Sequence, residues 1–258
     1  MTTLTTLGGS SAAISVGQGC AGYLIEHANT TVVLDLGPNT LLELRKHTDL
    51  RTLDALVISH LHMDHVFDAL ALRDTLVAIS PRREQPLPVW LPTDGIDLFA
   101  KAAAIFAAPQ DRDTYFAETH DLREVDPSLP LTVGGLTITF ARTVHAVPCW
   151  AMRVSPRDGS GDLVYTADTS DIAGLVDFAQ GAKVVISEAT YAETPAPEVS
   201  RSHISAEEAG ILAQTIGAET LVLTHIWEQT GPEAQRTRAA AAFTGTIAIA
   251  RPGVTIAW

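Results

Sequence analysis

A dense group of potential metal ligands follows a short apolar segment in the first third of the chain. Residues Ala55–Ser59 read Ala-Leu-Val-Ile-Ser, a run that predicts a buried strand. The next residues, His60-Leu61-His62-Met63-Asp64-His65, hold three histidines and one aspartate. Imidazole and carboxylate groups bind zinc, iron and manganese, and rigid strand ends commonly present functional side chains. The segment therefore predicts a metal site and not an ordinary polar loop.

The spacing within this segment suggests two ions. His60 and His62, two residues apart in an extended loop, can converge on one ion, whereas Asp64 and His65 can turn toward a second. The segment has no cysteine, which excludes a closed structural site built on thiolates.

The rest of the chain alternates short apolar strands with helical patterns. The predicted strands are Thr2–Leu7, Ala21–Glu26, Thr31–Leu36, Ala55–Ser59, Val89–Leu91, Leu136–Thr143, Cys149–Ser155, Leu163–Thr166, Lys183–Ser187, Leu221–Thr224, Thr246–Ala250 and Val254–Trp258. The predicted helices are Leu41–His47, Asp64–Ile79, Asp94–Ala107, Asp171–Gln180, Ser205–Ile216 and Pro232–Phe243. This pattern predicts an α/β (α+β) fold, with two sheets packed face to face and helices outside, as one domain over residues 1–258.

The motif His-x-His-x-Asp-His after a buried strand resembles the signature of the metallo-β-lactamase superfamily. Later segments resemble its other motifs in order: Thr143-Val144-His145, Tyr165-Thr166-Ala167-Asp168-Thr169 and Leu223-Thr224-His225. The resemblance covers nearly the whole chain and implies the four-layer αβ/βα sandwich of that family.

The resemblance also implies a complete ligand set for two divalent metal ions. One ion is expected on His60, His62 and His145, and the other on Asp64, His65 and His225, with Asp168 shared. Zinc is the expected metal, with manganese and iron as alternatives. Two such ions share a water, lower its pKa and stabilise the charge that develops on the substrate.

Two further segments carry candidate groups for proton transfer to the leaving group. Glu188 follows a strand, and His203 precedes a helix with a capping box, Ser205 and Glu208. A carboxylate that holds a histidine in its donor form is a familiar acid pair. Glu-Ala-Thr and the His203 segment resemble the phosphodiesterase branch that includes ribonuclease Z, although Ser187 stands where a histidine is usual. We expect Asp64, Glu188 and His203 to be the catalytic residues.

The substrate is expected to be small. Only residues 146–167 separate His145 from Asp168, and a hairpin uses them all, so the tRNA-gripping arm of short ribonuclease Z has no room. The net charge of −13 also argues against a large nucleic acid as partner. The chain resembles armless phosphodiesterases of the same branch, including atypical cyclic-nucleotide phosphodiesterases, and this resemblance implies a small phosphodiester such as a 3′,5′-cyclic nucleotide. A lactone or other carboxylic ester is the alternative, ahead of tRNA 3′-processing.

Several secondary expectations complete the prediction. The chain has no membrane segment or secretory signal, so a cytoplasmic protein is expected, with a homodimer as the oligomer suggested by the family. Cys149 is expected to be a buried apolar residue. Two segments are candidates for a wall over the site: Pro109–His120 and Tyr191–Ser202. Residues 8–11 are expected to form a turn, which lies either beside the metal site or away from it. The remaining histidines are expected at the surface: His27, His47 and His120.

Overall fold

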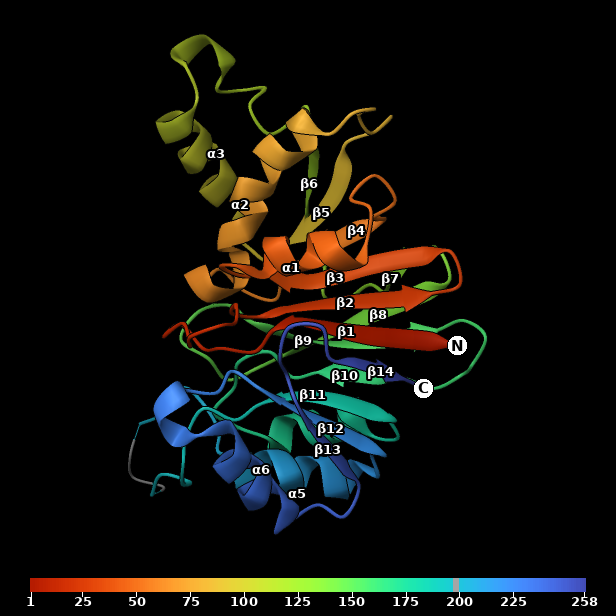
Figure 1. The fold of residues 1–258 in the computed structure, drawn as a ribbon, viewed down its shortest axis with the longest axis vertical. Coiled ribbons are helices and arrows are strands. Elements are labelled where there is room, and N and C mark those ends of the chain that lie inside the picture. The colour runs from red at the N-terminus through yellow and green to blue at the C-terminus, as the bar shows by residue number, and fades with distance from the viewer. Residues whose placement is uncertain (197–199) are drawn as a thin grey trace.

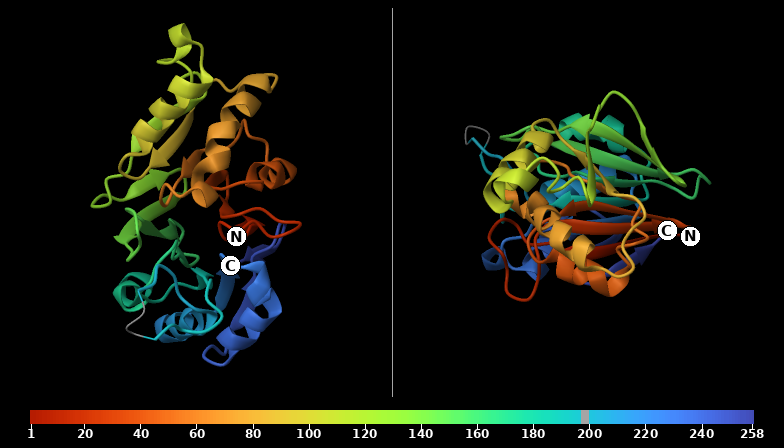
Figure 2. Two further views of the ribbon diagram at one scale, coloured as in Figure 1. Left: turned by 90° about the vertical axis from the view of Figure 1, so that its left-hand side faces the viewer. Right: turned by 90° about the horizontal axis from the view of Figure 1, so that it is seen from above.

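Two seven-stranded mixed sheets face each other in the computed structural model, which describes residues 1–196 and 200–258 (Figure 1). The first sheet has the order β14-β1-β2-β3-β4-β5-β6 and the second has the order β13-β12-β11-β10-β9-β8-β7. Helices α1, α2 and α3 cover the outer face of the first sheet, and α5 and α6 cover that of the second (Figures 1 and 2). This is the predicted four-layer α/β sandwich.

The strands of the first sheet are β1 (Thr2–Gly8), β2 (Gly22–His27), β3 (Thr30–Leu36), β4 (Ala55–Val57), β5 (Leu87–Leu91), β6 (His120–Glu124) and β14 (Thr255–Ala257). Those of the second sheet are β7 (Leu131–Val133), β8 (Leu136–Arg142), β9 (Trp150–Pro156), β10 (Leu163–Tyr165), β11 (Val184–Glu188), β12 (Thr220–Thr224) and β13 (Thr246–Ile249). Because β14 returns to pair with β1, the two chain ends lie side by side (Figure 1).

The helices are α1 (Thr40–His47), α2 (Met63–Ala78), α3 (Gly95–Phe106), α4 (Val176–Ala179), α5 (Ala206–Ile216) and α6 (Pro232–Ala240), with short 3-10 turns η1 (Pro109–Asp111), η2 (Ala173–Leu175) and η3 (Glu228–Thr230). The predicted capping box of α5 is present, since Ser205 and Glu208 each bond the other's backbone amide. No helix of the described residues has the length and apolar character needed to cross a membrane.

The strands bury apolar side chains on both faces, which explains why they read as continuous apolar runs. In β3, Val32 and Leu34 enter the layer between the sheets, whereas Val33 faces the helices of the first sheet. The inter-sheet layer also holds Tyr23 of β2 and Tyr165 of β10, whose rings lie 4.8 Å apart. These tyrosines place hydroxyl groups close to the end of the sandwich where the candidate ligands gather.

Some predicted elements differ from the structure. β6 and β7 were not predicted, because both are short strands at a sheet edge with little apolar alternation. The helix predicted over Asp171–Gln180 is only η2 followed by the single turn of α4. There, the Asp171 carboxylate accepts hydrogen bonds from the amides of Ala173 and Gly174, which favours a capped turn over a longer helix.

The surface assignment of two histidines is wrong. His27 and His120 are buried, with exposed fractions of 7% and 2%. His27 pairs with the hydroxyl of Thr2, and His120 lies 3.1 Å from the carbonyl oxygen of Ala69. Both act as satisfied core histidines. His47 is exposed, as predicted, and contacts Glu43.

Pro109–His120 does not line the ligand end of the sandwich. Its Tyr115 carbonyl accepts a hydrogen bond from Arg73 of α2, and its Phe116 ring lies 4.8 Å from that of Phe99 in α3. This segment therefore packs against the helices of the first sheet.

Candidate functional site

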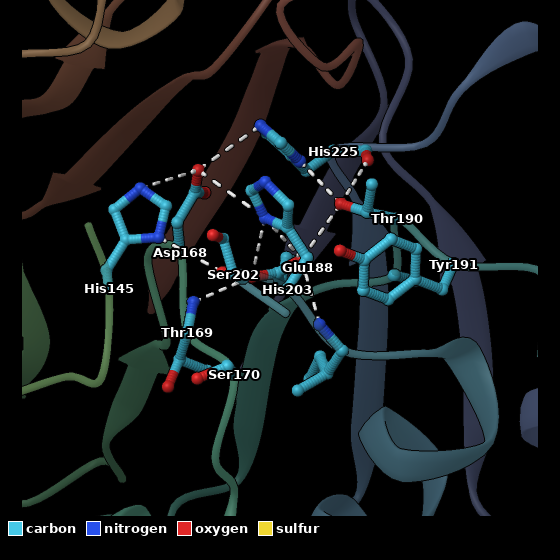
Figure 3. Close-up of polar contacts among 12 residues, drawn as sticks. His145, Asp168, Thr169, Ser170, Glu188, Thr190, Tyr191, Ser202, His203 and His225 are labelled. Carbon is cyan, nitrogen blue, oxygen red and sulfur yellow. Dashed lines mark hydrogen bonds and ion pairs between the residues drawn. The ribbon is translucent and has the colours of Figure 1, made fainter. Parts of the chain in front are cut away.

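The candidate ligands lie at the ends of four strands drawn from both sheets. His60, His62, Asp64 and His65 follow β4 and begin α2 in the first half of the chain. The others follow strands of the second sheet: His145 after β8, Asp168 after β10 and His225 after β12. Figure 3 shows three of these side chains pointing toward one another. The nitrogen and oxygen atoms of the candidate ligands fall into two groups, with the same members as the two ligand sets that the resemblance implies.

The first group contains His60, His62, His145 and Asp168. The Nδ1 atom of His62 lies 3.2 Å from Nε2 of His60 and 3.1 Å from Nε2 of His145. One oxygen of Asp168, Oδ2, lies 3.7 Å from His60 Nε2 and 3.8 Å from His145 Nε2. Three imidazoles and a carboxylate thus converge on one point.

The second group contains Asp64, His65, Asp168 and His225. The Nε2 atom of His225 lies 3.0 Å from Asp64 Oδ2 and 3.3 Å from Asp168 Oδ2. The Nε2 atom of His65 lies 3.5 Å from Asp64 Oδ2 and 3.4 Å from Asp168 Oδ1. Asp168 is therefore the one residue that belongs to both groups.

One buried nitrogen tests whether these residues suit a metal ion. His65 Nε2 has no hydrogen-bond partner among the described residues, although it is buried between two carboxylate oxygens. Unpaired buried nitrogens are rare in folded proteins. The donor set consists of nitrogen and oxygen atoms without a thiolate, and the lone pair of His65 Nε2 faces no hydrogen-bond donor among the described residues. Such a set fits a divalent cation such as zinc.

The opposite ring nitrogen of three histidines is held by an acceptor. His65 Nδ1 lies 2.7 Å from Asp35 Oδ2, and His145 Nδ1 lies 3.1 Å from the carbonyl oxygen of Ser202. His60 Nδ1 lies 3.0 Å from Ser59 Oγ, which itself donates to Asp35. Since these acceptors place the proton on Nδ1, Nε2 keeps its lone pair and faces the ligand cluster.

Asp35 was missed by the sequence prediction. It ends the apolar run of β3, and its carboxylate accepts hydrogen bonds from the Ser59 amide, the Ser59 hydroxyl, His65 and Tyr165. Its backbone has φ of 55°, a left-handed conformation that a residue of this type adopts at a cost. The signal in the sequence was a charged residue within Thr-Val-Val-Leu-Asp-Leu.

The histidines of the cluster differ in the direction in which their surroundings shift their pKa. Burial lowers the pKa of His60, His62 and His145, which favours the neutral form that binds metal. Burial alone would raise the pKa of Asp168, but the surrounding histidines, led by His225, hold it well below its usual value. Burial likewise opposes charge on His65, but Asp168 and Asp35 outweigh it and raise the pKa of that imidazole.

Glu188 and His203, which were predicted as an acid pair, lie together beside the second group (Figure 3). His203 Nδ1 lies 3.2 Å from each carboxylate oxygen of Glu188 and 3.8 Å from Asp168 Oδ2. The His203 ring stacks on that of His225 at 4.9 Å. Glu188 is 1% exposed, whereas the side chain of His203 is 20% exposed, so only the histidine reaches solvent.

The residue before Glu188 stays outside the site. Ser187 is buried and its hydroxyl donates to the Glu188 carbonyl oxygen. The Glu188 carboxylate is held instead by the Thr169 amide, 2.6 Å from Oε1, and by the Thr190 hydroxyl, 2.8 Å from Oε2. Burial raises the pKa of Glu188.

Two loops border the cluster. The turn that follows β1 contacts the His225 segment, because the Ile226 amide donates to the Gly9 carbonyl oxygen and Ser10 pairs with Ile226. In the predicted wall Tyr191–Ser202, Ser202 bonds His145 and the Tyr191 ring lies 6.0 Å from that of His203, while residues 197–199 lie outside the described residues. Cys149 is buried, as predicted.

Comparison with known proteins gives the family. The family model described as beta-lactamase superfamily domain matches residues 30–226 of the sequence, which include every candidate ligand. The chain belongs to the beta-lactamase superfamily. Within it, the chain is 33% identical over 239 residues to the probable metallo-hydrolase YhfI of Bacillus subtilis (strain 168), covering 92% of this chain and 91% of that protein.

Solved structures agree with this membership. The crystal structure of YhfI, a metallo-beta-lactamase fold protein, superposes with a TM-score of 0.85 at 29% identity over the whole of both chains. The short form of human tRNase Z gives 0.74 at 19% identity, over 99% of this chain and 98% of that one. A diphosphatase of the PhnP family gives 0.72 at 17%, over 100% and 98%. The protein is a hydrolase of this superfamily, with His/Asp clusters suited to metal ions.

Proposed function

We propose that the protein is a dinuclear phosphodiesterase that hydrolyses a small phosphodiester, such as a 3′,5′-cyclic nucleotide. The observation that carries this proposal is the contact between Glu188 and His203 directly beside Asp168, with His203 Nδ1 3.2 Å from the Glu188 carboxylate. A leaving alkoxide needs a proton, and this pair offers a histidine oriented to give one.

The two groups of donor atoms support two ion sites. His60, His62 and His145 would hold one divalent ion, Asp64, His65 and His225 the other, and Asp168 both; zinc suits these ligands best. When bound, the ions supply a nucleophile at neutral pH and stabilise negative charge on the phosphoryl oxygens.

The chain's own residues supply the remaining chemistry. Glu188 accepts the Nδ1–H of His203 and favours the doubly protonated ring, so that the proton on Nε2 faces the substrate and is the one given to the leaving alkoxide. His203 is partly exposed and is the proton donor, while Glu188 is buried and acts through it. Glu188 is thus a positioning residue, a narrower role than the catalytic one predicted from the sequence.

A small substrate is supported by the hairpin that follows His145. Strands β9 and β10 pair in antiparallel register, and residues 146–167, all described, leave no segment for an arm. The net charge of −13 adds to this argument, because a long nucleic acid needs many cationic contacts. Cleavage of precursor tRNA is therefore not expected.

A lactone or other carboxylic ester is the second candidate, favoured by apolar side chains next to ligands in the sequence. Met63, Val144 and Trp227 have exposed fractions of 66%, 57% and 41%. Each is within two residues of a proposed ligand in the sequence, and an uncharged, apolar substrate that covers these side chains would gain from burying them.

The test is a substrate screen on zinc-loaded protein with metal content measured on the same sample. Turnover of bis(p-nitrophenyl) phosphate and 3′,5′-cyclic AMP, without cleavage of a lactone panel, is the expected result. Full metal occupancy with lactone cleavage alone would replace the proposal by the second candidate. Full occupancy without turnover of either phosphodiester would refute it.

A further inference from the structure

Thr190 occupies a position between the two parts of the site. Its side chain is fully buried, and Oγ1 lies 2.7 Å from His225 Nδ1 and 2.8 Å from Glu188 Oε2 (Figure 3). The His225 carbonyl oxygen is a third neighbour at 3.1 Å. This hydroxyl is therefore in contact with a proposed metal ligand and with the carboxylate that holds His203.

Counting protons fixes the direction of these hydrogen bonds. A threonine hydroxyl has one hydrogen to donate and two lone pairs to accept. The Glu188 carboxylate already receives donors from Thr169 and His203, and it also accepts from the Thr190 hydroxyl. The Glu188 carboxylate and the His225 carbonyl oxygen can only accept, so the one hydrogen of Thr190 goes to these oxygens and its Oγ1 accepts the proton on His225 Nδ1. His225 Nε2 then keeps its lone pair toward Asp64 Oδ2, 3.0 Å away.

We propose that Thr190 is a positioning residue that couples the second ion site to the proton-donating histidine through Glu188. Two histidines are linked to the Glu188 carboxylate. His203 contacts it directly, and His225 is linked to it through the hydroxyl of Thr190. The two imidazoles stack at 4.9 Å, so the carboxylate sets the orientation of both rings. The proposal depends on the ligand role of His225 in the proposed function, but not on the substrate.

Removing the hydroxyl tests this coupling. In Thr190→Val the shape is kept, but the buried Nδ1 proton of His225 loses its acceptor. Loss of such an outer partner typically weakens metal binding about 10–100-fold. We expect that weakening for one of the two Zn²⁺ ions, measured by competition with a chelator in the absence of substrate. Thr190→Ser keeps the hydroxyl and should bind both ions like the parent.

Thr224→Val is the matched control. Thr224 is also buried and adjoins His225, but its hydroxyl pairs with the Tyr23 hydroxyl at 2.7 Å and not with the site. The same chemical change there removes one buried hydrogen bond and should leave both Zn²⁺ affinities within about threefold of the parent, since outer-partner losses are larger. Equal Zn²⁺ affinities in Thr190→Val and Thr224→Val would overturn the proposal, as would equal weakening in Thr190→Val and Thr190→Ser.

A measurement on the parent protein avoids any folding defect in the variants. Nitrogen-15 NMR of the zinc-loaded parent distinguishes a protonated Nδ1 from a metal-bound nitrogen in His225. A protonated Nδ1 with zinc on Nε2 supports the proposal, and zinc on Nδ1 refutes it. Because neither experiment uses a substrate, an inactive phosphodiester screen would leave this result intact.

Discussion

Asp35 Oδ2 lies 2.7 Å from His65 Nδ1 and also accepts the hydroxyl of Tyr165, so one buried carboxylate joins α2 of the first half to β10 of the second. Through the Ser59 hydroxyl the same carboxylate also reaches His60. Two proposed ligands in different ion sites thus depend on one residue outside both.

Asp35→Asn should therefore weaken both ion sites. The amide nitrogen is itself a donor, and donors already point at both oxygens of Asp35: three at Oδ2 and the Ser59 amide at Oδ1. Outer-partner losses of this kind cost about 10–100-fold in metal affinity. The expected result is a lower Zn²⁺ content after dialysis against a chelator. Tyr165→Phe, which removes a donor but leaves the carboxylate, is the control. Equal zinc content in Asp35→Asn and the parent would contradict this role.

His203→Ala should separate proton transfer from metal binding. If His203 is the proton donor, the variant keeps both ions but loses about 10²–10⁴-fold in rate. His62→Ala and Asp168→Ala should lose both zinc and activity. His47→Ala removes a similar side chain that pairs with Glu43 on α1 and should leave the rate unchanged. A full rate in His203→Ala would remove this residue from the mechanism.

Gly37→Ala should displace the start of α2. A Cβ atom at Gly37 would lie 1.8 Å from the Asp64 carbonyl oxygen, so the backbone that carries Asp64 must move. Overpacking of this kind costs about 1–3 kcal/mol in the free energy of unfolding. Gly174→Ala is the control, because its Cβ would meet only a side-chain oxygen of Asp171 at 3.3 Å. Urea unfolding of the two variants compares them; equal stabilities would contradict the expected clash.

Stability should fall in mild acid because of His120. Burial lowers the pKa of His120 to about 4, below the value near 6.5 of an unfolded chain. Between these values the unfolded state binds a proton that the folded state does not. The contribution is therefore fully present above pH 6.5, is lost as the pH falls toward 4, and amounts to about 3 kcal/mol. His120→Gln cannot titrate, so its unfolding free energy should depend less on pH in this window. Parallel profiles for parent and variant would contradict the assignment.

The ligand positions were predictable because a strand end is marked in the sequence itself. His60, His145, Asp168 and His225 each follow an apolar run, and parallel strands bring such ends to one edge of a sheet. The alternation of strands and helices was enough to predict the four layers. The ligand groups needed the family resemblance in addition.

Other features depend on contacts between distant residues and could not be predicted. Asp35 finds Ser59, His65 and Tyr165 only once both sheets have packed, and nothing local to its strand indicates those partners. The burial of His120 depends on β6, an edge strand whose sequence, His-Asp-Leu-Arg-Glu, is largely polar. In both cases contacts with residues distant in the sequence determine the environment of the side chain, and local propensity does not.

The contribution of both sheets to one cluster has a consequence for biosynthesis. Ribosomes make the chain from its N-terminus, so His60 to His65 emerge long before His225, the last proposed ligand. A nascent chain could complete the donor set of the first ion once Asp168 has emerged, whereas the second ion must wait for β12. The donor set of the second ion is thus complete only after β12 has been made, later in synthesis than that of the first.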